Sequence, residues 1–155
     1  MENAVICFDK GFLQLDGAMG TVLQQRGLKP GGIGELLNLT DPELLKSVYR
    51  DYIQAGSQII YANTFGANAL KLSGTGHGVE EVISAAIRTA REAGAGTETK
   101  VALDVGPLGQ LLEPMGTLTF ERAYDLFREM MEAGAKAGAD LVVIETMTDL
   151  YEAKA

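Results

Sequence analysis

The chain has 155 residues, 46% of them apolar, so it is long enough to bury one hydrophobic core and too short for several domains. Its 21 acidic and 13 basic residues give a net charge of -8 and form no basic cluster, which argues against a nucleic-acid partner or an anionic membrane surface. Because it has neither a bilayer-length apolar run nor a secretory leader, we expect a cytoplasmic protein with no membrane partner.

Four short apolar or β-branched runs alternate along the chain with longer segments of helical periodicity. This alternation is typical of parallel strand-helix units. The runs carry little polarity on either face, as in strands that are covered on both sides by helices or by a barrel interior. The predicted strands are residues 12–15, 58–62, 101–103 and 141–144.

The clearest helix start lies between the first two predicted strands. Thr40 and Glu43 stand three positions apart in the pattern of a capping box, with Pro42 in the first turn, where its missing N–H costs nothing. We therefore expect Thr40 to be the N-cap of a helix that starts near Asp41 and ends near Gly56.

Two further helices follow the second and third predicted strands. Apolar residues at spacings of three and four predict one helix over residues 79–93 and another that begins after Thr119, with Glu121 in its first turn. The expected core residues of these helices are Val82, Ile83, Ala86, Ile87, Ala90, Ala123, Leu126, Phe127, Met130 and Met131.

A repeat runs through this pattern. Residues 55–58 and 137–140 both carry an Ala-Gly step directly before a strand, at a separation of 82 positions, or two units. Each predicted strand also closes on a polar residue, and these residues are separated by 47, 41 and 41 positions. They are Asp16, Asn63, Asp104 and Glu145.

These observations predict an α/β fold, namely the N-terminal half of a (β/α)8 TIM barrel with about four βα units. We expect residues 1–155 to form a single partial barrel domain, truncated or split at its C-terminal end. The first and fourth strands of such a half barrel lack neighbours, so we expect a homo-oligomer or a complementary C-terminal half barrel as partner. Whether the chain is a natural split protein or a truncated one stays open.

The strongest candidate site is the turn after the first strand. Asp16 is followed by Gly17, Ala18, Met19 and Gly20, small residues that let backbone N–H groups approach a ligand before a helix begins. A carboxylate beside free amides suits a zwitterion, with the ammonium group on Asp16 and the carboxylate on the amides. The alternative is that Asp16 only closes a helix-capping turn.

The other strand ends are weaker candidates. Glu145 follows four apolar residues, where an unpaired carboxylate is costly, so we expect a ligand cation or a buried hydrogen-bond network beside it. Asp104 could contact a ligand or serve the turn after it. Asn63, with Thr64 and Phe65, could orient a substrate and cover it with a ring, or could simply form a tight turn.

The remaining polar motifs carry no chemistry that we can assign. The glycine-rich loop around His77 lies far from its strand and is followed by Glu80 and Glu81, which would repel a phosphate. Cys7 is the only cysteine, so no disulfide framework and no closed zinc site can form within the chain. We therefore predict no catalytic residue and no metal ligand here.

Several segments resemble the homocysteine-binding domain of the homocysteine S-methyltransferase family, most closely its cobalamin-dependent members. The similarity runs along essentially the whole chain. Its motifs are residues 15–21, 35–40, 63–68, 105–109, 113–117 and 144–147.

The resemblance implies a barrel that binds homocysteine and transfers a methyl group to its thiolate, giving methionine. It implies contacts from Asp16 and Glu145 to the substrate amino group and from residues 17–20 to its carboxylate. It also implies zinc held by three cysteines and, in the cobalamin-dependent members, methylcobalamin as donor. Those cysteines belong to the second half of the barrel, beyond residue 155, so we expect this chain to hold no cofactor and to be inactive alone.

Two other interpretations stay open at this point. The chain could be a noncatalytic half barrel that serves as a binding or assembly module. It could also belong to an unrelated barrel enzyme that acts on another small amino acid, because Asp16 and Glu145 suit any ammonium group.

Overall fold

The computed structural model describes residues 13–29 and 31–155. Strands and helices alternate along this part of the chain. The strands are β1 (Ile59–Tyr61), β2 (Lys100–Val105) and β3 (Leu141–Ile144). The helices are α1 (Met19–Gln25), the 3-10 helix η1 (Gly34–Leu36), α2 (Leu37–Thr40), α3 (Pro42–Gln54), α4 (Val79–Ala93), α5 (Phe120–Ala137) and α6 (Leu150–Lys154).

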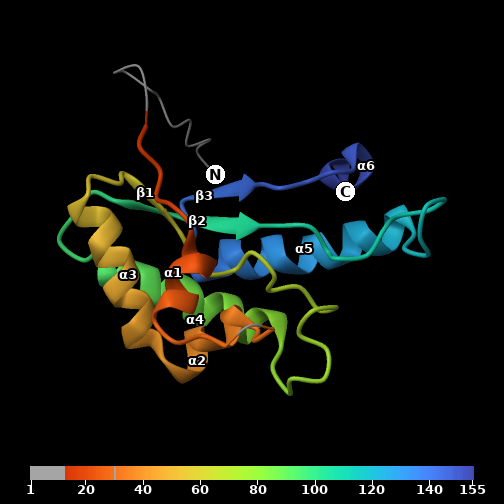
Figure 1. The fold of residues 1–155 in the computed structure, drawn as a ribbon. Helices are drawn as coiled ribbons and strands as arrows, with labels where there is room; N and C mark the ends of the chain where they lie inside the picture. The colour runs from red at the N-terminus through yellow and green to blue at the C-terminus, as the bar shows by residue number, and fades with distance from the viewer. Residues whose placement is uncertain (1–12, 30) are drawn as a thin grey trace.

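The three strands form one parallel sheet in the order β1-β2-β3 (Figure 1). Tyr61 pairs with Ala102, and Val105 pairs with Ile144. Because the strands are parallel and neighbours in sequence are neighbours in the sheet, their carboxyl ends meet at one edge. The predicted strands over 58–62, 101–103 and 141–144 are confirmed, and β2 extends further than predicted.

The first predicted strand is present only in part. Phe12 lies outside the described residues. Leu15 makes a single parallel bridge to Ile59, whose carbonyl oxygen accepts a 3.0 Å hydrogen bond from the backbone N–H of Asp16. Residues 13–15 therefore lie beside β1, in the place of a first strand, but their pairing is too short to count as one. They have a strand neighbour on one side only, and the Leu15 side chain is 43% exposed.

Two of the predicted helices begin where the sequence indicates. α4 spans Val79–Ala93, as predicted. α5 begins directly after Thr119, whose hydroxyl oxygen accepts a 3.2 Å hydrogen bond from the backbone N–H of Arg122. Of the ten core residues expected on these helices, nine are buried and Met131 is partly buried against the core.

The predicted capping box at the start of α3 is wrong by one residue. Asp41, not Thr40, is the N-cap, and its Oδ1 atom accepts a 3.2 Å hydrogen bond from the backbone N–H of Leu44. Thr40 is the last residue of α2, and its hydroxyl instead donates 3.1 Å to the carbonyl of Leu36. A helix directly upstream leaves Thr40 in a helical turn, so its side chain satisfies a carbonyl of that turn rather than an amide of the next.

The sequence repeat corresponds to two equivalent helix-to-strand turns. Gly56 follows α3 with φ of 105°, and Gly138 follows α5 with φ of 85°. Side chains other than glycine rarely adopt this left-handed backbone, so glycine ends each helix and redirects the chain into a strand.

Helices α3, α4 and α5 lie on one side of the sheet, with α4 in contact with the other two (Figure 1). The core fills the space between these helices and the strands. α5 approaches β2 closely, because a Cβ atom on Gly134 would lie 2.7 Å from Cδ2 of Leu103. Consecutive parallel strand-helix units packed in this way are the building blocks of a TIM barrel.

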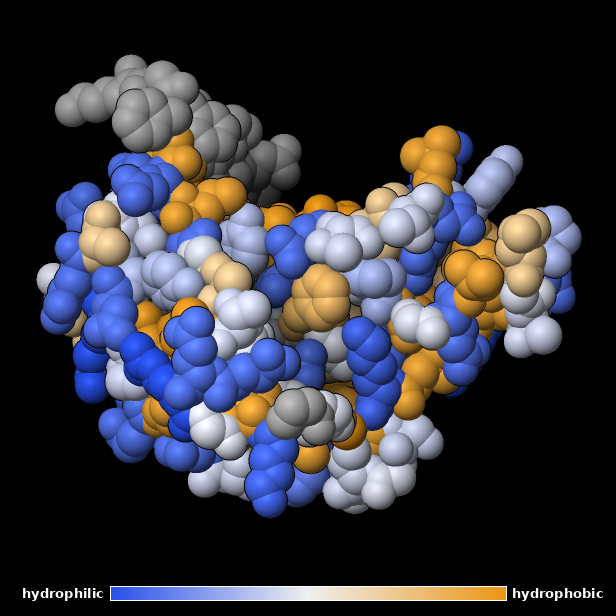
Figure 2. Space-filling view, in the orientation of Figure 1, coloured by the Kyte–Doolittle hydropathy of each residue, from blue (hydrophilic) through white to orange (hydrophobic). Residues whose placement is uncertain are grey.

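The outer edge of β3 is open in the described part of the chain. No other strand pairs with this edge in the sheet formed by residues 13–29 and 31–155, and Val142 and Ile144 are 44% and 52% exposed. Apolar residues reach the surface along the upper margin of the molecule, where the sheet lies (Figure 2). None of the helices described for this chain is both long and apolar enough to span a bilayer.

Candidate functional site

The polar strand ends meet around one cavity of about 600 Å³ at the carboxyl edge of the sheet. Asp16 comes from the end of the first segment, Asn63 follows β1, Asp104 lies near the end of β2, and Glu145 directly follows β3. The turn after Asp16 also lines this cavity, through Gly17, Ala18, Met19 and Gly20. Of the nine predicted site residues, only Thr64 does not line it.

Asp16 has one oxygen engaged and one free. Its Oδ2 atom accepts a 2.9 Å hydrogen bond from the backbone N–H of Tyr61, while Oδ1 is buried and lacks a partner in the described structure. Burial raises the pKa of Asp16 from 3.8 to about 7, and the nearby charge of Glu145 adds to the rise. The free oxygen of Asp16 is therefore a hydrogen-bond acceptor without a donor.

Asp104 is the most buried carboxylate of the cavity, with only 8% of the residue exposed. Its Oδ1 atom also lacks a hydrogen-bond partner among the described residues. Burial is the main reason that its pKa rises to about 7, followed by the charges of Glu145, Asp16 and Glu35. A second acceptor oxygen therefore lies unused at the same cavity.

Glu145 and the turn after Asp16 frame the cavity from two sides. The backbone N–H of Glu145 donates 3.1 Å to the carbonyl of Val105, which places Glu145 at the end of β3 beside β2. On the other side, the hydroxyl of Tyr52 donates 2.9 Å to the carbonyl of Ala18. A Cβ atom on Gly17 would lie 3.0 Å from the Tyr52 ring, so a larger residue there would crowd this ring.

Asn63 is held by several hydrogen bonds at the end of β1. Its Nδ2 group donates 2.8 Å to the carbonyl of Gly34, and its backbone N–H donates 2.9 Å to the hydroxyl of Tyr49. The carbonyl of Asn63 accepts 2.7 Å from Nδ2 of Asn38. These bonds attach η1, α2 and α3 to the end of β1 at the wall of the cavity.

Thr64 links β1 to β2 and does not reach the cavity. Its side chain is fully buried, its hydroxyl donates 2.8 Å to the carbonyl of Asp104, and the same oxygen accepts 3.0 Å from the backbone N–H of Asp104. The sequence interpretation of Thr64 as a residue that orients a substrate is therefore replaced by a structural one, in which Thr64 positions the backbone of Asp104.

Four polar residues that line the cavity were not among the predicted site residues, namely Thr21, Gln24, Glu35 and Tyr61. Tyr61 lies inside β1, and its side chain lines the cavity because its strand position alternates with the core-facing Ile60. Glu35 comes from η1, and its Oε1 atom accepts a 2.6 Å hydrogen bond from the backbone N–H of Gly66. The only signal for Glu35 was its place in residues 35–40, one of the segments that resemble the family.

The cavity is acidic. Its lining residues include Asp16, Glu35, Asp104 and Glu145 and, within the described chain, no lysine, arginine or histidine. No group of three metal-binding side chains occurs among residues 13–29 and 31–155. Carboxylates with unpartnered buried oxygens suit a ligand that carries both positive charge and N–H donors, such as an ammonium group.

The two motifs judged uninformative in the sequence lie elsewhere. His77 is away from the cavity, with its Nδ1 atom 3.1 Å from Oε2 of Glu81 on the first turns of α4. Cys7 lies outside the described residues.

Comparison with known proteins gives a consistent family. Residues 13–155 match the sequence profile of a family described as homocysteine S-methyltransferase. The chain is 32% identical over 160 residues to a methionine synthase of Mycobacterium tuberculosis and 33% identical over 161 residues to a methionine synthase of Mycobacterium leprae. Each alignment covers 90% of this chain but only 13% of the relative.

Solved structures of similar fold extend the same comparison. The homocysteine methyltransferase MmuM from Escherichia coli in its oxidized form superposes with a TM-score of 0.80 at 26% identity, covering 93% of this chain and 56% of that one. The metallated form of the same protein superposes with a TM-score of 0.80 at 28% identity, and the match covers 93% of this chain and 57% of the E. coli chain. The present chain thus corresponds to about half of these structures.

Proposed function

Because the chain belongs to the homocysteine S-methyltransferase family, we propose that it is the homocysteine-binding part of such an enzyme. One observation supports this most directly: the acidic cavity holds two buried carboxylate oxygens, on Asp16 and Asp104, that have no donor. An empty acceptor of this kind is costly unless a ligand supplies the missing hydrogen bond.

In the proposed complex the substrate binds through its zwitterionic end. The ammonium group lies between Asp16 and Glu145, whose charges are close enough for Glu145 to raise the pKa of Asp16. The α-carboxylate lies at the backbone of residues 17–20, on the same wall of the cavity. Asp104 lies beside this ammonium site, and Asn63 forms part of the wall next to it.

The residues present do not fit the zinc site that the family resemblance implies. A zinc ion that lowers the thiol pKa needs several soft ligands, and this chain has one cysteine and one histidine in total. His77 does not line the cavity, and Cys7 lies outside the described residues. We therefore propose that the chain binds homocysteine but does not transfer a methyl group alone. The methyl donor, methylcobalamin in the cobalamin-dependent members, belongs to the complete enzyme.

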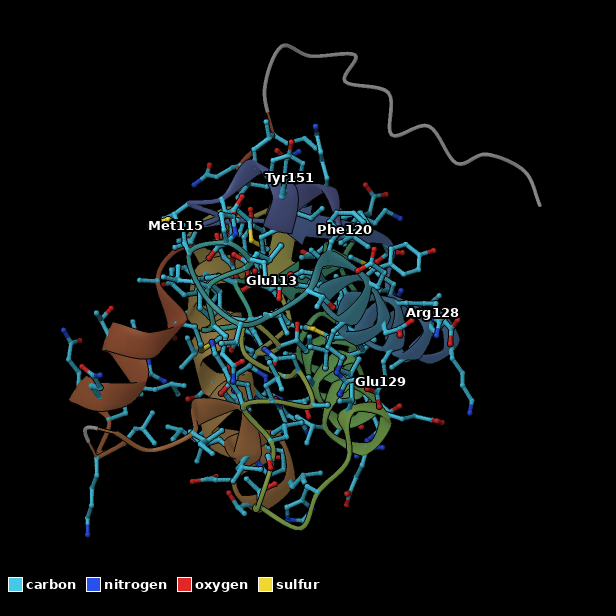
Figure 3. All side chains as sticks on the ribbon, turned by 90° about the vertical axis from the view of Figure 1, so that its right-hand side faces the viewer. Glu113, Met115, Phe120, Arg128, Glu129 and Tyr151 are labelled. Atoms are coloured by element: carbon cyan, nitrogen blue, oxygen red, sulfur yellow. The ribbon has the colours of Figure 1, made fainter. Side chains whose placement is uncertain are left out.

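We further propose that residues 1–155 form a single partial barrel domain that is completed by further strand-helix units. Support comes from the open edge of β3 and from the 44% of the E. coli chain that the superposition does not cover. Further exposed apolar residues are Met115 from the β2–α5 loop, Phe120 from the start of α5 and Tyr151 from α6, on the face shown in Figure 3. A complementary half barrel or a second copy of the chain would cover them.

Titration calorimetry with the 155-residue chain tests the proposed function. We expect heat of binding with L-homocysteine and none with N-acetyl-L-homocysteine, which has the same thiol and carboxylate but no ammonium group. Equal affinity for the two compounds, or no binding of homocysteine, would show that the acidic cavity does not recognise the amino group. Restored methyl transfer on mixing with the second half of a relative would support the partial-barrel proposal.

A further inference from the structure

The ring of Phe65 lies directly against the backbone of Gly106. A Cβ atom on Gly106 would be 2.5 Å from both Cδ2 and Cζ of Phe65, far inside van der Waals contact. Gly106 is not among the glycines with positive φ, so its backbone conformation does not itself require glycine. The three heavy atoms nearest to this Cβ position all belong to the ring.

Two further contacts hold Phe65 in place. The backbone N–H of Gly106 donates 3.1 Å to the carbonyl of Phe65, which ties the end of β2 to the segment after β1. The ammonium group of Lys71 lies over the ring, 5.1 Å from its centroid, at a cation–π distance. The orientation of the ring is thus set by neighbours from two segments.

Phe65 lines the same cavity as the four carboxylates. If the charged end of an amino acid lies at Asp16, Glu145 and the turn after Asp16, its apolar end must lie against another wall. An aromatic ring is well suited to this, because sulfur-aromatic contacts are favourable by themselves and a ring also covers methylene groups.

We propose that Phe65 is a specificity-determining residue that contacts the sulfur-bearing end of the substrate, and that Gly106 and Lys71 are the residues that position its ring. This inference rests on the proposed function, because it takes the amino acid to be bound at the acidic wall. The contact with Phe65 would select among amino acids by their side chains, which the carboxylates cannot do because they bind only the amino group.

The test compares two ligands that share the zwitterionic end. L-homocysteine has a terminal thiol, and L-2-aminobutyrate is the same molecule without the sulfur. We expect the wild-type chain to prefer homocysteine and Gly106→Ala to lower this preference about three- to tenfold, as expected from the loss of a sulfur-aromatic contact. Gly78→Ala is the matched control, since a Cβ there meets nothing within 4 Å and φ is -91°.

Two more variants keep the test decisive if Gly106→Ala fails to fold. Phe65→Leu preserves an apolar wall without the ring, and Lys71→Met removes the charge above it. We expect both to lower the preference for homocysteine, Phe65→Leu more strongly. An unchanged ratio of the two affinities in the variants that fold would overturn the inference, even if both affinities fell together, since equal losses indicate only a structural role. Absence of homocysteine binding in the wild type would instead refute the proposed function.

Discussion

The Oδ2 atom of Asp16 accepts a 2.9 Å hydrogen bond from the backbone N–H of Tyr61. This bond joins the end of the first segment to the end of β1. Asp16 lines the cavity, and its other oxygen, Oδ1, is buried without a partner among the described residues. The arrangement that holds Asp16 in place therefore leaves it with one unused acceptor oxygen. The buried carboxylates of this cavity should affect the stability of the chain, the pH dependence of that stability and the affinity for a ligand.

We expect the ligand-free chain to lose stability as the pH rises from about 4 to about 7. Over this range folded Asp104, with a pKa of about 7, keeps a proton that the unfolded chain, with a carboxyl pKa near 3.8, has released. The stabilisation is complete below the unfolded pKa and is lost as the pH passes the folded one. Asp16 contributes in the same direction.

Asp104→Asn removes one of these groups. We expect the decrease in unfolding free energy between pH 5 and pH 8 to become smaller by roughly 2–4 kcal/mol, measured by chemical denaturation. Asp125→Asn, at an exposed position on α5, is the control and should leave the pH profile unchanged. If the unfolding free energy changes with pH by the same amount in the wild type and in Asp104→Asn, burial does not raise the pKa of Asp104 in the folded chain.

Thr64→Val should destabilise the chain by about 1–3 kcal/mol. Valine has nearly the shape of threonine, but it cannot donate to the carbonyl of Asp104 or accept from its N–H. Thr64→Ser keeps the hydroxyl and should recover most of the loss. If in thermal melts the valine variant is as stable as the wild type and the serine variant is destabilised, the methyl group and not the hydroxyl is what matters.

The contact between α5 and β2 depends on Gly134. Gly134→Ala should lower the free energy of unfolding by about 1–3 kcal/mol, because the new methyl group would lie 2.7 Å from Leu103. The higher helix propensity of alanine offsets part of this loss. Gly20→Ala in α1 introduces the same methyl group with nothing within 4 Å and should stabilise the chain slightly. Denaturation midpoints that shift in the same direction for both variants would contradict the packing argument.

Homocysteine affinity should rise roughly tenfold between pH 6 and pH 8. Asp16 must be ionised to attract the ammonium group, and its pKa in the empty cavity is about 7, so most molecules are protonated at pH 6 and ionised at pH 8. Calorimetry at three pH values measures this rise. In Asp16→Asn the affinity should be low and depend much less on pH, and a wild-type profile that is flat over this range would show that Asp16 does not bind the amino group.

Much of the fold and part of the site could be predicted because both follow from local pattern. Alternation of strands and helices gives a parallel sheet, and in a parallel sheet the residues that close the strands come together. Asp16, Asn63, Asp104 and Glu145 therefore line one cavity although they are more than 40 positions apart in the chain.

The features that the sequence did not predict depend on tertiary contacts. Asp41 replaces Thr40 as the cap because α2 ends directly before α3. Thr64 was grouped with Asn63 by its position, but its hydroxyl is taken up by the backbone of Asp104 on the next strand. Glu35 belongs to no local sequence pattern, and its place at the cavity, with its Oε1 atom bonded to the backbone N–H of Gly66, depends on contacts between distant segments.

In the proposed complex, the carboxylates of Asp16 and Glu145 bind the amino group of homocysteine. Titration calorimetry of L-homocysteine into the wild type and the double variant Asp16→Asn with Glu145→Gln tests it most directly. The control is Asp125→Asn with Glu132→Gln, the same change in charge at two exposed positions beside Arg128. We predict that the cavity variant loses at least about thirtyfold in affinity and that the control keeps wild-type affinity. Equal affinity in the wild type and the cavity variant would contradict the account.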